Sequence, residues 1–139
     1  MSDLVLDASL ALQWFLEDEA DRKYSLTVLG SLSEKQAVVP ALWFYEVGNG
    51  LLMAYRRKRI AEDQIDGFLT RLKNLPIEVA PQAPNELLEL PSLAQTHGLT
   101  NYDAAYLSLA LPQLASRNYR YRRVAHTSVL RVGLLTLPG

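Results

Sequence analysis

The sequence of 139 residues contains no cysteine, and this absence removes several kinds of chemistry at once. A chain without thiols forms no disulfide, no thiolate metal site and no cysteine nucleophile. Long apolar runs are also missing, because none approaches the roughly 18 residues that a membrane-spanning helix needs. Histidine is scarce, since His97 and His126 are the only two and neither lies in a recognisable motif. We therefore expect a structural role for both histidines and no membrane-spanning segment.

Acidic residues are missing from the last part of the chain. No Asp or Glu follows Asp103, whereas the same stretch holds five arginines: Arg117, Arg120, Arg122, Arg123 and Arg131. The whole chain is nearly neutral, with a net charge of −1, so its total charge favours no particular partner. The N-terminus carries Asp3 and Asp7 and no basic region, which is not typical of a signal peptide, and we expect a cytoplasmic protein.

Length and composition predict one domain over residues 1–139. Apolar residues make up 49% of the chain, enough for a buried core. Their spacing predicts strands at residues 4–9, 37–40, 76–80, 113–116 and 131–137, and helices at residues 9–18, 21–34, 41–57, 62–73, 83–100, 103–111 and 119–130. Strands separated by helices in this way predict an α/β fold, in which helices cover both faces of a parallel sheet.

Single residues mark where several of these helices begin and end. Ser9 is placed to cap the first helix, and Asn85 is a plausible cap for the helix in residues 83–100. Pro91 predicts an interruption within that stretch, and Gly98 predicts its end.

Three acidic residues lie where packing gives no reason for a charge. Asp7 ends an apolar strand, Glu46 lies inside "LWFYEVGNGLL", and Asp103 lies inside "NYDAAYLSLAL". Charged side chains are rarely buried unless they are paired or bind a ligand, and ligands of parallel sheets gather at the carboxyl ends of the strands. Three carboxylates meeting there would repel one another unless a cation neutralised them. We expect a hard divalent cation, Mg²⁺ or Mn²⁺, bound by Asp7, Glu46 and Asp103.

Each of these acids also has a simpler explanation. Asp7 is placed to cap the helix that follows it, and Glu46 is available for an ion pair with an arginine on a neighbouring helix. Asp103 precedes an apolar helix, where a negative charge interacts favourably with the helix dipole. These alternatives stay open at this point.

The basic segment suggests contact with a polyanion. Four of its arginines alternate with Tyr119 and Tyr121; they are Arg117, Arg120, Arg122 and Arg123. Arginine binds phosphate and tyrosine stacks on unpaired bases, so we expect these four arginines to bind RNA. The alternative is an ordinary surface helix with incidental charge. The cluster "RRKR" at residues 56–59 ends a helix, where positive charge is favourable in any case.

Three stretches together resemble the PIN-domain ribonucleases, in particular the VapC-type toxins of toxin–antitoxin pairs. They are "LVLDASLALQWFLEDE", "VVPALWFYEVGNGLLMAYRRKRI" and "HGLTNYDAAYLSLALP", in the order that the family has them. The resemblance implies a three-layer α/β/α sandwich with a short, mostly parallel sheet. It also implies Mg²⁺- or Mn²⁺-dependent endonuclease cleavage of structured RNA (tRNA or rRNA), a homodimer, and a VapB-like antitoxin held against the early helices.

The resemblance carries over residue by residue. Asp7, Glu46 and Asp103 match three acids of the catalytic metal site, and Ser9 falls where the family has a Ser or Thr close to the metal. In this comparison Asn49, one helical turn after Glu46, orients that glutamate. Asn118 stands where the family usually has a fourth acid, and the C-terminal region is shorter than usual. An amide keeps the oxygen ligand but loses the charge, so three acids hold one Mg²⁺.

Two other functions compete with the nuclease. A catalytically weak PIN module that binds antitoxin or RNA is suggested by Asn118. A phosphoacceptor domain that uses Asp7 is disfavoured, because it needs an acid pair before the first helix and a lysine after a late strand, and no lysine follows Lys73.

Overall fold

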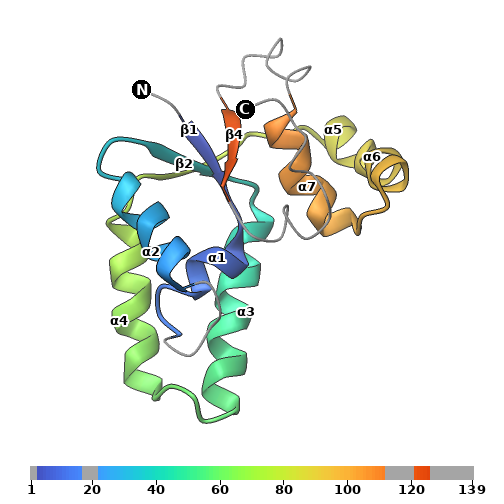
Figure 1. Ribbon diagram of the computed structural model, residues 1–139. Coiled ribbons are helices and arrows are strands. Elements are labelled where there is room, and N and C mark those ends of the chain that lie inside the picture. The colour runs from blue at the N-terminus through green and yellow to red at the C-terminus, as the bar shows by residue number, and fades with distance from the viewer. Residues whose placement is uncertain (1–2, 17–21, 112–120, 126–139) are drawn as a thin grey trace.

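The structure, a computed structural model, describes residues 3–16, 22–111 and, as backbone, 121–125 (Figure 1). Its centre is a sheet in which every pair of neighbouring strands is parallel. The strands are β1 (Asp3–Leu6), β2 (Gln36–Val39), β3 (Ile77–Val79) and β4 (Tyr121–Ala125). Their order across the sheet is β3-β2-β1-β4. The deeply buried strands β1 and β2 therefore lie in the middle of the sheet.

Helices lie on both sides of this sheet (Figure 1). One group consists of α1 (Ala8–Leu12), α2 (Arg22–Ser31), α3 (Leu42–Arg56) and α4 (Glu62–Lys73), and the other of α5 (Pro84–Leu88), α6 (Leu90–His97) and α7 (Asn101–Ala110). In the second group α7 packs against β1 and β4, and α6 packs on α7. The predicted α/β fold with three layers and a parallel sheet is confirmed.

After their polar first residues, Asp3 and Gln36, the central strands are apolar because helices cover both of their faces. Val5 and Leu6 of β1, like Ala37, Val38 and Val39 of β2, are completely buried. In the parallel register Val5 lies beside Val38 on one side and beside Val124 on the other. As a result, both strands end at the same edge of the sheet, which is the edge where α1 and α3 begin.

The predicted helix over residues 119–130 is wrong for its described part. Residues 121–125, Tyr-Arg-Arg-Val-Ala, form β4, whose backbone pairs with β1. Tyrosine and valine favour strands, and without β4 the backbone of β1 would be left unpaired on one side. The predicted strands at residues 113–116 and 131–137 lie outside the described residues.

Two of the predicted helix caps are also wrong. The N-cap of α1 is Asp7 and not Ser9, which is the second residue of the helix. Asn85 lies inside α5, which begins with Pro84, a residue whose fixed φ suits the first helical position. The end at Gly98 is confirmed, since this residue has a φ of +65° at the C-cap of α6. The predicted interruption is also present, although it falls at Glu89, two residues before Pro91.

Among the described helices, none combines the length and the apolar character that crossing a bilayer requires.

A glycine allows α1 to approach α3 closely. A Cβ atom added to Gly50 would lie 2.9 Å from Cδ2 of Leu12 and against its Cδ1 atom, whereas one added to Gly48 would have no neighbour within 4 Å. The absence of a side chain at Gly50 therefore sets the separation of the two helices that follow β1 and β2.

We expect Gly50→Ala to reduce the free energy of unfolding by about 1–3 kcal/mol, because the added methyl group displaces Leu12. Gly48→Ala in the same helix is the matched control. It should leave stability unchanged or raise it by up to about 1 kcal/mol, the helix-propensity gain of alanine. Urea unfolding of both variants measures the difference, and equal stability of the two would contradict the close approach.

Candidate metal centre

Asp7 connects the end of β1 to the start of α1. Its side chain is 5% exposed, and it accepts hydrogen bonds from the backbone N–H of Ser9, at 3.1 Å, and from the Ser9 hydroxyl. Asp7 therefore caps α1, as the simpler explanation for this residue predicts. A carboxylate accepts several bonds through its two oxygens, so capping orients Asp7 without excluding a metal ion.

Glu46 lies in the second turn of α3, the helix that follows β2. Its half-buried carboxylate accepts a hydrogen bond from the hydroxyl of Tyr106, which comes from α7. Within the described part of the chain no arginine pairs with it, so the ion pair considered as an alternative is not seen there. Sequence reasoning did not identify Tyr106. The available signal was its position on α7, one turn after Asp103.

Asp103 lies in the first turn of α7. The N-cap residue, Thr100, accepts a hydrogen bond from the backbone N–H of Asp103 at 3.0 Å. A negative charge is favourable at this end of a helix, as the simpler explanation for Asp103 requires. Its carboxylate is half-buried and makes no hydrogen bond or ion pair with the described residues.

The three carboxylates interact electrostatically. Burial raises the pKa of Glu46 above its usual value of 4.5, and the negative charges of Asp7 and Asp103 raise it further, whereas the bond from Tyr106 lowers it. The pKa of Tyr106 is raised in turn, first by burial and then by its bond to Glu46. Segments far apart in the sequence thus place Asp7 and Asp103 within electrostatic range of Glu46.

The donor set fits a hard divalent cation in its chemistry, because carboxylate and hydroxyl oxygens are the ligands that such ions prefer. The three acidic side chains do not, however, form a cluster around one point. In residues 3–16 and 22–111, no three acids or histidines are grouped so as to hold a metal ion. Ser9 bonds to Asp7 and Tyr106 bonds to Oε1 of Glu46, and these bonds orient the two acids. The side chains must come closer together before all three acids can bind one ion.

The remaining predicted site residues fall into two groups. Ser9 contacts Asp7, whereas Asn49 is exposed on α3 and makes no hydrogen bond to Glu46. Arg117, Asn118 and Arg120 lie outside the described residues. Arg122 and Arg123 belong to β4, for which the structure describes only the backbone. The roles of all these residues stay predictions.

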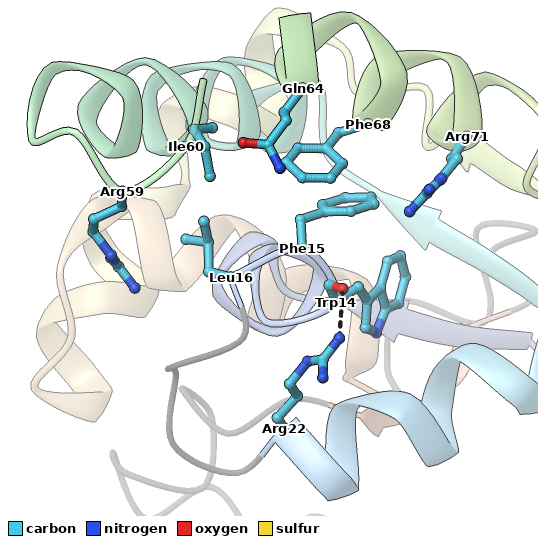
Figure 2. A pocket seen from close by; sticks show the side chains of 9 residues that line it. All are labelled: Trp14, Phe15, Leu16, Arg22, Arg59, Ile60, Gln64, Phe68 and Arg71. Atoms are coloured by element: carbon cyan, nitrogen blue, oxygen red, sulfur yellow. Dashed lines mark hydrogen bonds between the residues drawn. The ribbon is translucent and has the colours of Figure 1, made fainter. Parts of the chain in front are cut away.

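A separate pocket of about 500 Å³ opens between the segment 14–16 that follows α1, the start of α2, and α4 (Figure 2). Aromatic rings form its apolar wall: Phe15 stacks on Phe68 with ring centroids 4.5 Å apart, and Trp14 meets Phe15 edge-on. Three arginines surround this wall; they are Arg22, Arg59 and Arg71. None of the three acids lines the pocket.

Replacing Glu46 with Gln is expected to stabilise the metal-free protein at neutral pH, because it removes a charge that burial and two like charges disfavour. Glu46 ionises near pH 4.5 in the unfolded chain and at higher pH in the folded one. The gain should therefore be absent below about pH 4.5, grow as the pH rises through both pKa values, and be complete above the folded one. We expect about 1 kcal/mol or less, since water screens a half-buried group. Thermal unfolding midpoints across this range measure it, and a variant less stable than wild type at neutral pH would contradict it.

Comparison with known proteins places these features in a family. The family model of the PIN domain matches residues 4–126, a range that includes all three acids, Tyr106 and every strand from β2 to β4. No curated protein matches the chain. PIN domains are generally nucleases that use divalent metal ions. Because the match spans most of the sequence, the chain belongs to the PIN-domain family.

Proposed function

We propose that this protein is an endoribonuclease that depends on Mg²⁺ or Mn²⁺ and acts as the toxin of a type II toxin–antitoxin pair. The observation that carries the proposal is the electrostatic coupling of Glu46 to Asp7 and Asp103. Three like charges near one another are costly unless a cation is bound between them. Family membership supports nuclease chemistry, and the resemblance of the three quoted motifs to VapC-type toxins supports the narrower assignment to RNA.

In this proposal Asp7, Glu46 and Asp103 hold the ion. A bound divalent ion lowers the pKa of a water molecule and polarises the scissile phosphate. The chain orients its own ligands: Ser9 bonds to Asp7, and Tyr106 bonds to Glu46. One metal suits this site better than two, because Asn118 replaces the fourth acid of the family.

RNA is held by the basic C-terminal segment in the same proposal. Its four arginines follow α7 in the sequence, and the strand β4 lies next to β1, the strand that leads into Asp7. Guanidinium groups bind phosphate through paired hydrogen bonds, and neighbouring tyrosines stack on unpaired bases. The proposed RNA contacts are Arg117, Arg120, Arg122 and Arg123.

The second candidate is a catalytically weak PIN module that binds antitoxin or RNA without efficient cleavage. Two observations favour it: Asn118 in place of an acid, and the lack of a preformed three-acid cluster among the described residues. Cleavage assays separate the two functions, because only the nuclease requires the acids for turnover.

We expect the purified protein to cut structured RNA with Mg²⁺ or Mn²⁺ and to lose this activity in EDTA. Asp7→Asn, Glu46→Gln and Asp103→Asn should each reduce kcat/KM by at least about 100-fold, because each removes charge that the ion needs. Asp66→Asn, an exposed acid on α4, is the control and should cut as wild type does. Sequencing of RNA 5′ ends after the reaction detects new cleavage sites. Identical ends with wild type and Asp103→Asn would exclude the nuclease and favour the weak module.

We further propose that the antitoxin occupies the pocket between residues 14–16, the start of α2, and α4 (Figure 2). The pocket combines an apolar aromatic wall with positive charge, which suits a segment that carries an acidic residue beside an apolar one. Arg71 lies over the ring of Phe68, at 5.9 Å from its centroid, and Arg22 donates to the carbonyl oxygens of Gln13 and Trp14. Their side chains are thus held at the pocket wall.

A second copy of this chain is proposed to cover α3. Several large apolar side chains of this helix are exposed: Phe44, Tyr45, Leu52 and Tyr55. Phe44, Leu52 and Tyr55 recur at helical spacing and share one face, which is typical of a surface that meets a partner.

Light scattering tests both partner proposals in one experiment. The protein alone should have the mass of two chains, and the mass should increase when the small protein encoded beside its gene is co-purified with it. Arg71→Glu should weaken this complex at least about tenfold, because it reverses one charge of the pocket. Arg57→Glu, on an exposed arginine that does not line the pocket, is the control. A single-chain mass would contradict the dimer, and an unaffected complex would contradict the pocket.

A further inference from the structure

We propose that the hydroxyl group of Tyr106 is a positioning group that holds the Glu46 carboxylate beside α7, the helix of Asp103, for metal binding. The inference rests on the proposed function, since it assigns a role toward the same ion. It concerns a residue that does not itself bind the metal.

The Tyr106 side chain is 1% exposed, so its hydroxyl lies in the protein interior. A buried hydroxyl is costly unless it is hydrogen-bonded. Here the hydroxyl donates to the carboxylate of Glu46, so this bond joins α7 to α3.

This bond links two of the acid-bearing segments. Glu46 lies on α3, and Tyr106 lies on α7, one turn after Asp103. Asp7, at the start of α1, is near enough to the Tyr106 hydroxyl that its negative charge contributes to the raised pKa of Tyr106.

Core packing alone does not account for this arrangement. A phenylalanine would fill nearly the same volume, but it would leave Glu46 without its donor. Glu46 is repelled by Asp7 and Asp103, and it is only half-buried. Without the hydroxyl bond, this repulsion favours rotation of the Glu46 side chain away from the other two acids. The bond opposes that rotation.

Binding of Mn²⁺ tests the inference without reliance on catalysis. Titration of the full chain, followed by the electron paramagnetic resonance signal of free Mn²⁺, compares wild type with Tyr106→Phe. We expect the variant to fold, as judged by circular dichroism, and to bind Mn²⁺ about 10- to 100-fold more weakly. Tyr102→Phe removes a hydroxyl from the same helix at a residue that is 63% exposed, and it should bind as wild type does.

A double-mutant cycle separates positioning from a general loss of structure. If Tyr106 acts through Glu46, then Tyr106→Phe should weaken Mn²⁺ binding little or not at all when Glu46→Ala, which removes the acceptor of the hydroxyl, is already present. Equal weakening in both backgrounds would overturn the inference, as would wild-type affinity in Tyr106→Phe. Wild-type protein that binds no Mn²⁺ would overturn the proposed metal site and this inference with it, so the two failures are distinguishable.

Discussion

Repulsion between carboxylates is the constraint on which the rest of this structure depends. Burial raises the pKa of Glu46, and the negative charges of Asp7 and Asp103 raise it further. Three like charges repel one another and come together only where other interactions hold them. Here the parallel sheet does so, because neighbouring strands β1 and β2 end at the same edge and release Asp7 and the helix of Glu46 there. The apolar burial of both strands supplies the favourable free energy that offsets the repulsion.

The polar contacts around the acids have a consistent pattern. Ser9 donates to Asp7, and Tyr106 donates to Glu46, so each bond supports the charged form of its partner. Neither donor carries a positive charge. A guanidinium or ammonium group would neutralise the acids and compete with a metal ion, whereas hydroxyl and amide donors orient them and leave their charge in place. Arg22, Arg59 and Arg71 lie instead at the aromatic pocket of Figure 2, which is lined by none of the three acids.

The sequence allowed the fold class and most element positions to be predicted, because apolar runs such as Val5 and Leu6 must be buried and their spacing differs between strands and helices. It also singled out three acids with apolar flanks. Tyr106 could not be recognised in the same way, since a tyrosine among apolar residues is usually a core residue and its partner, Glu46, is distant in the chain. Residues 121–125 were misassigned because pairing with β1, a tertiary interaction, decides their conformation.

The central claim is that Asp7, Glu46 and Asp103 share one divalent ion. Anomalous diffraction from crystals soaked in Mn²⁺ tests it most directly. The account predicts a single manganese peak bound by oxygens of these three side chains, with Glu46 turned from its metal-free orientation only as far as the Tyr106 bond allows. A peak at another position, or none while each carboxylate stays engaged by its own neighbour, would contradict the claim.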